Sequence, residues 1–199
     1  MKKSTLNRSL FVMVATAMLS AVSLVLMLIE FPLLPGAAYL KMDFSDIPAL
    51  LGAILFGPLC GVLIELIKNI LEMLIKGLGT QLGFGNLMNF IIGCAYLLPF
   101  SIFYHSLEKK AKPVGIRIFV AAAAGMIVMV VLGFFANMIV APMFFRYFLQ
   151  TPLGSNEVLA YAWISVPFNL LKGVVITVVM IPLLTIVLKP VRRMVDKVC

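Results

Sequence analysis

The amino-acid sequence predicts an all-α integral membrane protein: a single domain, residues 1–199, of six transmembrane helices with both termini in the cytoplasm. Of its 199 residues, 63% are hydrophobic and only 12% are charged, whereas about 25% of a typical soluble domain is charged. A soluble fold of this length leaves much of its chain exposed, so it cannot hide this much apolar surface from water. The apolar residues form long unbroken runs, unlike the alternating segments of roughly ten residues in a membrane β-barrel. Composition therefore excludes a soluble enzyme, a nucleic-acid-binding domain and a disordered tail.

Basic residues determine the predicted number of helices. They gather before the first apolar segment, between residues 109 and 117, and after residue 188. Positive residues favour the cytoplasmic side of a membrane, so the net charge of +8 indicates orientation rather than nucleic-acid binding. If all three groups share that side, the three apolar segments before residue 109 must hold four spans. Gly57 and Pro58 divide the middle segment, because Pro ends a helix. The predicted helices are residues 9–29, 46–56, 59–76, 86–104, 116–145 and 161–188.

The second predicted helix is short for a membrane span. Residues 46–56 would rise only about 16 Å, against roughly 30 Å of hydrocarbon, so we expect flanking loop buried in protein to complete the crossing. Ser45 or Asp46 suits the cap of this helix, and Pro48 suits its first turn. The preceding segment, residues 30–45, is an external loop too apolar for water, and we expect it to fold onto the helices or to line a pocket.

No motif in the sequence indicates catalysis or metal binding. The chain lacks a phosphate-binding loop, a Ser–His–Asp arrangement, a His-Glu-x-x-His motif and paired cysteines, and its one histidine is His105. We therefore expect no enzyme, no catalytic cofactor and no metal. Transport, channel formation or a membrane scaffold remains.

Lys172 is the most informative residue. It lies eleven positions after Tyr161, about 16 Å into the predicted helix, where an ionisable side chain is costly and tends to be functional. Ser165 and Asn169 share its helical face, and Asn137 lies at a similar height on the neighbouring helix. Two interpretations stay open, a structural ion pair within the bundle and a ligand site, of which we favour the second. An unpaired buried ammonium costs several kcal/mol, roughly, so an empty site should keep water or an internal partner at Lys172.

Residues 59–76 carry opposite charges along one face. Glu65, Lys68, Glu72 and Lys76 follow i,i+3 and i,i+4 spacing, which favours self-neutralising pairs. Either glutamate could also reach Lys172. Two other functions remain open on this basis: a stand-alone ion-coupled secondary transporter with Glu65, Lys68 and Glu72 as a relay, or a scaffold in which Lys172 only pairs with Glu65 or Glu72.

Four segments carry a resemblance to a known family: residues 39–48, residues 56–58 with Gly61, residues 67–69 and residues 167–173. The chain resembles substrate-binding S components of energy-coupling factor (ECF) vitamin transporters, specifically the riboflavin-binding RibU type. The resemblance implies six helices and a pocket that opens outward, formed by the first external loop and the outer halves of the last three helices. It implies these substrate-binding residues: Tyr39, Leu40, Met42, Asp43, Asn89, Asn137, Asn169 and Lys172.

The resemblance also implies partners and a location. Riboflavin, or a related flavin such as its phosphate, would be the transported ligand, and the chain would bind it with high affinity for ATP-driven uptake. A membrane coupling subunit and two ATPase subunits would supply the energy, and the protein would sit in the plasma membrane of a prokaryote. Ala17 and Ala21, small residues four apart on the first helix, would dock the coupling subunit. Lys41 departs from the expected pattern, and a cation beside the pocket mouth would favour a phosphorylated flavin.

Overall fold

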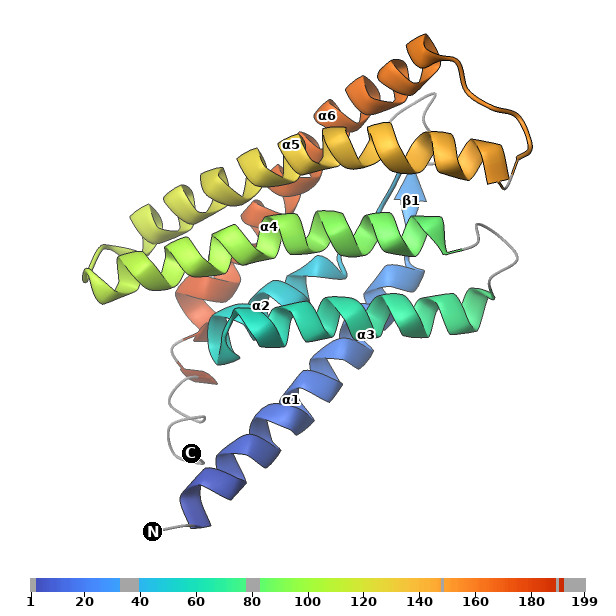
Figure 1. Ribbon diagram of the computed structural model, residues 1–199. Helices are drawn as coiled ribbons and strands as arrows, with labels where there is room; N and C mark the ends of the chain where they lie inside the picture. The colour runs from blue at the N-terminus through green and yellow to red at the C-terminus, as the bar shows by residue number, and fades with distance from the viewer. Residues whose placement is uncertain (1–2, 33–39, 78–82, 148, 189, 192–199) are drawn as a thin grey trace.

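The computed structural model describes residues 3–32, 40–77, 83–147, 149–188 and 190–191. Within these residues the chain forms six α-helices, one short antiparallel hairpin and a terminal π-helix. The elements are α1 (Lys3–Leu28), β1 (Phe31–Pro32), β2 (Lys41–Met42), α2 (Asp46–Phe56), α3 (Pro58–Lys76), α4 (Phe84–Lys109), α5 (Val114–Tyr147), α6 (Ser155–Pro182) and η1 (Leu183–Val187). Successive helices run in alternating directions, so that the hairpin and the α5–α6 connection lie at one end and the α4–α5 connection at the other (Figure 1).

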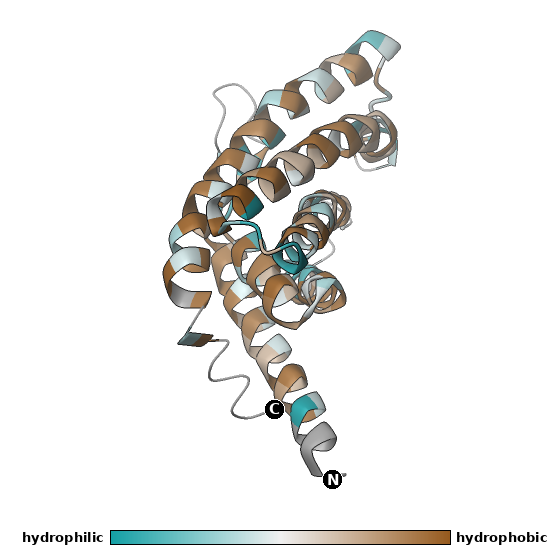
Figure 2. Ribbon diagram, turned by 90° about the vertical axis from the view of Figure 1, so that its left-hand side faces the viewer, coloured by the Kyte–Doolittle hydropathy of each residue, from teal (hydrophilic) through white to brown (hydrophobic). Residues whose placement is uncertain are grey.

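Four of the helices are long and apolar enough to cross a membrane, namely α1, α4, α5 and the α6 helix with the first part of η1. The other two helices do not meet this condition. The α2 helix has only 11 residues, and α3 carries four charged residues on its polar face. Apolar colouring covers most of each helix (Figure 2), and large side chains such as Met18, Phe119 and Ile127 are exposed. The fold is therefore that of a helical membrane protein.

The break between α2 and α3 confirms the predicted division at Gly57. This residue has a φ of +107°, a backbone conformation that side chains with a Cβ rarely adopt. Pro58 occupies the first turn of α3, where its missing N–H leaves no hydrogen bond unmade.

The start of α6 differs from the prediction. The helix begins at Ser155 rather than at residue 161, so residues 155–160, which precede the predicted sixth helix, are also helical. The Glu157 carboxylate accepts a hydrogen bond from the Gly154 backbone N–H at 2.8 Å, which satisfies a donor at the helix N-terminus.

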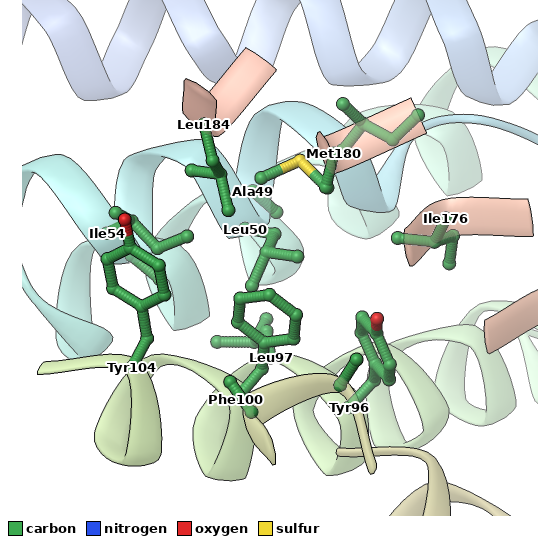
Figure 3. Packing of buried hydrophobic residues seen from close by; sticks show 14 of the residues in the cluster. Ala49, Leu50, Ile54, Tyr96, Leu97, Phe100, Tyr104, Ile176, Met180 and Leu184 are labelled. Atoms are coloured by element: carbon green, nitrogen blue, oxygen red, sulfur yellow. The ribbon is translucent and has the colours of Figure 1, made fainter. Parts of the chain in front are cut away.

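Short α2 is surrounded by other helices. It packs against α1, α3, α4 and α6, and its side chains Ala49, Leu50 and Ile54 are almost fully buried. Figure 3 shows them facing aromatic and aliphatic residues of α4, α6 and η1. The labelled partners are Tyr96, Leu97, Phe100, Tyr104, Ile176, Met180 and Leu184. Four neighbouring helices therefore cover this 11-residue helix.

Candidate ligand-binding site

A cavity of about 350 Å³ lies among α4, α5, α6 and the β2 end of the hairpin. Leu40 and Lys41 border it beside the hairpin, and α4 to α6 supply the rest of its wall. Much of that wall is aromatic: Phe84, Phe144, Phe145, Tyr161 and Phe168. A mostly apolar concave site of this size with a few polar groups is typical of small-molecule binding.

The polar groups of the cavity come from all three helices. Asn89 lies on α4, Asn137 on α5, and Ser165, Asn169 and Lys172 on α6. The α6 residues follow one another at i, i+4 and i+7, so a regular helix turns all three side chains the same way. Asn137 Nδ2 donates to the Gly133 carbonyl at 2.8 Å, which leaves its amide oxygen for another partner.

Close packing of α5 against α6 fixes Asn169. A Cβ added at Gly133 would overlap the Asn169 amide nitrogen. Glycine at this point therefore lets the amide lie directly against the α5 backbone, and Asn169 is buried while still bordering the cavity.

Lys172 is both ion-paired and part of the cavity wall. Its Nζ lies 2.8 Å from Asp46 Oδ2 on α2. Asp46 Oδ1 in turn accepts a hydrogen bond from Lys68 Nζ at 2.6 Å, and Lys68 also lies 2.9 Å from Glu65 Oε2. We call Asp46, Glu65, Lys68 and Lys172 the buried ion cluster, because each of these side chains is at most 3% exposed. The expectation of an internal partner at Lys172 is confirmed.

The identity of that partner corrects the sequence analysis. The Asp46 side chain does not cap α2, and neither does that of Ser45, which occupies the N-cap position without a side-chain capping bond. Glu65 pairs with Lys68 rather than Lys172, and Glu72 pairs with Lys76 and accepts a hydrogen bond from Asn86. The predicted i,i+3 and i,i+4 pairs on α3 are confirmed, but the proposed reach of either glutamate to Lys172 is wrong.

The other predicted substrate-binding residues divide into three groups. Leu40 and Asn89 border the cavity with the residues of α5 and α6 described above. Met42 and Asp43 are buried behind the wall and are not among its lining residues. Asp43 instead contacts Asn89, whose Nδ2 donates to Asp43 Oδ2 at 3.4 Å. Tyr39 lies outside the described residues.

The aromatic wall was not predicted. Phe84, Met88 and Ile92 line the cavity from α4, and their i,i+4 spacing is the signal that could have indicated an apolar wall there. In a chain with so many apolar residues, this spacing does not distinguish a cavity wall from a lipid-facing or packed surface.

Ion pairs hold the hairpin beside the cavity. Glu30, just before β1, lies 2.6 Å from Lys41 of β2 and 3.1 Å from Lys76 at the end of α3. Burial alone would raise the pKa of the Glu30 carboxyl, but the hydrogen bonds from Lys41 and Lys76 outweigh it and hold that pKa below its ordinary value.

The two predicted docking alanines lie on an exposed part of α1. Ala17 borders a second groove between α1 and α3, which also includes Val12, Cys60 and Leu63. This groove is separate from the cavity among α4, α5 and α6.

Comparison with known proteins identifies the family. Residues 11–184 match the family described as ECF transporter, substrate-specific component. The chain belongs to this family. It is thus a substrate-specific (S) component, a subunit of a membrane transporter rather than of an enzyme, and associates with an ECF module.

Named relatives and a solved structure agree with this assignment. The S component is 38% identical over 181 residues to the riboflavin transporter FmnP of Bacillus subtilis (strain 168), covering 89% of this chain and 92% of the relative. It is 32% identical over 169 residues to the riboflavin transporter RibU of Staphylococcus aureus (strain TCH60), covering 85% and 86%. Its fold is similar to that of a solved S component of a bacterial ECF transporter, with a TM-score of 0.65, 29% identity, and coverage of 88% and 94%.

Proposed function

We propose that this S component is the high-affinity riboflavin-binding subunit of an ATP-driven ECF uptake system, and that the cavity among α4, α5 and α6 is its binding site. The observation that carries this proposal is the position of Lys172 on the wall of a largely aromatic cavity, beside Asn137 and Asn169. The relatives named as riboflavin transporters, at 38% and 32% identity, support the ligand.

The chemistry of the cavity suits a flavin. An isoalloxazine ring has broad apolar faces and a polar uracil-like edge with both donors and acceptors. Aromatic side chains such as Phe84 and Phe168 suit the faces. Carboxamides can donate to and accept from the edge, and the Lys172 ammonium can donate to a carbonyl or hydroxyl oxygen.

The proposed orientation places the cavity on the extracellular side. The α4–α5 connection and the helix ends beside it carry four basic residues, namely Lys109, Lys110, Lys112 and Arg117. This connection lies at the end of the bundle opposite the hairpin (Figure 1). Because positive residues favour the cytoplasm, the cavity end faces outward. Six passes then place both termini in the cytoplasm of a prokaryotic cell, with α2 and α3 as two of the passes.

The chain depends on other subunits for energy. We propose that Ala17 and Ala21 dock a membrane coupling subunit, which two ATPase subunits drive. Their exposure on α1 leaves this small-residue surface open for close helix contact.

The ion-relay alternative is less consistent with the geometry. Glu65 and Lys68 are fully buried in mutual ion pairs and do not line the cavity. Glu72 is paired with Lys76.

Binding to the purified chain tests the proposal. Riboflavin titrated into the protein in detergent should lose its fluorescence in a saturable manner, because aromatic rings packed on a flavin quench it. Riboflavin phosphate, titrated in parallel, measures whether Lys41 at the cavity rim favours a phosphorylated ligand. A chain that leaves the fluorescence of both flavins unchanged would contradict the proposed function.

A further inference from the structure

The buried ion cluster has one member that a ligand can reach. Its two carboxylates and two ammonium groups cancel in formal charge, and they come from three helices, α2, α3 and α6. Of the four residues, only Lys172 lines the cavity. Asp46, Glu65 and Lys68 lie behind it, where they can influence a ligand only through Lys172.

Asp46 is divided between the two lysines. One carboxylate oxygen accepts from Lys68 at 2.6 Å, and the other lies 2.8 Å from Lys172. Lys68 is itself held by Glu65 and by the Ser45 hydroxyl, which accepts a hydrogen bond at 2.6 Å. The carboxylate is therefore fixed from the side away from the cavity. Among the residues described, it is the acid within ion-pair distance of Lys172.

This arrangement determines what Lys172 can offer to a ligand. A lysine side chain has a flexible four-carbon stem, and ordering it on binding opposes affinity. An ammonium has three donors, so one can remain on Asp46 while others meet a ligand. Anchoring through Asp46 orders the stem before the ligand arrives, which is the general route by which preorganisation raises affinity.

We propose that Asp46 is a positioning residue for substrate binding: held by Lys68, it fixes the Lys172 ammonium at the cavity wall. The substrate on which it acts is the flavin of the proposed function, and the inference rests on that function. Asp46 does not line the cavity and does not touch the ligand. Its effect on affinity passes through Lys172.

A double-mutant cycle on Asp46 and Lys172 tests the proposal, with riboflavin affinity measured by fluorescence quenching. We expect Asp46→Asn to weaken binding at least about tenfold, and Lys172→Met to weaken it by at least as much. In Asp46→Asn with Lys172→Met, riboflavin should bind as it does to Lys172→Met alone, within about threefold. A role of Asp46 independent of Lys172 would instead multiply the two losses.

Glu72→Gln is the matched control. It removes one buried negative charge, as Asp46→Asn does, but Glu72 pairs with Lys76 and lies outside the buried ion cluster, so the contact between Asp46 and Lys172 stays intact. We expect it to change riboflavin affinity less than about threefold. An equal loss in both variants would show that buried charge balance, rather than positioning, controls affinity, and would overturn the proposal.

A charge-conserving variant covers the case in which Asp46→Asn does not fold. Asp46→Glu keeps the negative charge but moves the carboxylate by one methylene, so Lys172 should shift and riboflavin binding should weaken at least about threefold. Thermal unfolding of the same samples reports the fold. Wild-type affinity in Asp46→Asn would refute the positioning role, and where Asp46→Asn does not fold, wild-type affinity in Asp46→Glu would refute it. A wild-type chain that binds no riboflavin would instead refute the proposed function, and this inference with it.

Discussion

At the scale of single residues, Lys172 combines two interpretations that the sequence left as alternatives. Its ammonium is neutralised by Asp46, which makes it a structural ion pair, and it also borders the cavity, which makes it available to a ligand. Three donors on one nitrogen allow both. A buried cation in this protein is thus stable without its ligand, because its counter-ion belongs to the fold.

Gly133→Ala tests how closely the cavity amides are placed. The added methyl would overlap the Asn169 amide nitrogen, which is the movable end of a side chain and not backbone. We expect Asn169 to rotate, so that the fold is retained while riboflavin affinity falls by about tenfold, near the value of one lost hydrogen bond. Fluorescence titration measures the affinity.

The control for Gly133→Ala is Gly115→Ala. The space around Gly115, near the start of α5, is open: apart from its chain neighbours and its own helix backbone, no atom lies within 4 Å of an added Cβ. This variant should bind riboflavin as the wild type does. Equal affinity of Gly133→Ala and the wild type would show that the position of Asn169 does not limit binding.

The sequence predicts the residues that share one helix better than the contacts between helices. Ser165, Asn169 and Lys172 follow from helical spacing alone, and the structure places them on one wall of the cavity. The contact between Asp46 and Lys172 joins residues far apart in the chain, on helices whose packing no local pattern specifies. In the first turn of a helix, Asp46 has the features of a cap residue, so its local context conceals its long-range partner.

At the scale of elements, α2 and the hairpin depend on their neighbours. The bounds of α2 follow from Gly57 and Pro58, and the prediction of residues 46–56 is confirmed. The burial of α2 by four other helices could not be predicted, because a short apolar run has the same sequence pattern in a helix that partly spans a membrane and in a buried core helix. The two-residue strands of the hairpin are too short to give an alternating pattern.

Glu30→Gln tests the ion pairs that hold the hairpin against α3. The pKa of Glu30 is lower in the folded chain than its ordinary value of 4.5. Its charge therefore stabilises the fold above pH 4.5, and this contribution is lost as the pH falls below 4.5. These groups are partly exposed, so we expect their ion pairs to contribute only about 0.5 kcal/mol to the free energy of unfolding. Thermal unfolding of the wild type between pH 7 and pH 3.5 should therefore show a larger loss of stability than that of Glu30→Gln.

Glu157→Gln, measured by thermal unfolding over the same pH range, is the control for Glu30→Gln. Glu157 lies in the first turn of α6, away from the hairpin, and hydrogen bonds to Gly154. Its amide can still reach Gly154 through the side-chain oxygen. If Glu30→Gln loses as much stability on acidification as the wild type, the ion pairs with Lys41 and Lys76 do not stabilise the hairpin.

At the scale of the whole molecule, the proposed ligand cavity and the proposed docking surface are separate. The cavity lies among α4, α5 and α6, whereas Ala17 and Ala21 lie on α1. The buried ion cluster connects α2, α3 and α6, and α2 and α3 in turn pack against α1. A subunit that binds on one surface and is moved through another requires such a division, because docking must not compete with the ligand.

Ala17→Leu with Ala21→Leu tests this division. Both side chains are exposed, so larger ones should not disturb packing within the chain, but they would hold a partner helix away from α1. Riboflavin affinity of the purified variant should stay within about twofold of the wild type, while uptake in cells that supply the coupling subunit and ATPases should fall to background. Met18→Leu, at an exposed position on the same helix, should retain uptake. Normal uptake by the double variant would place the docking surface elsewhere, and a parallel loss of binding would show that α1 and the cavity are not independent.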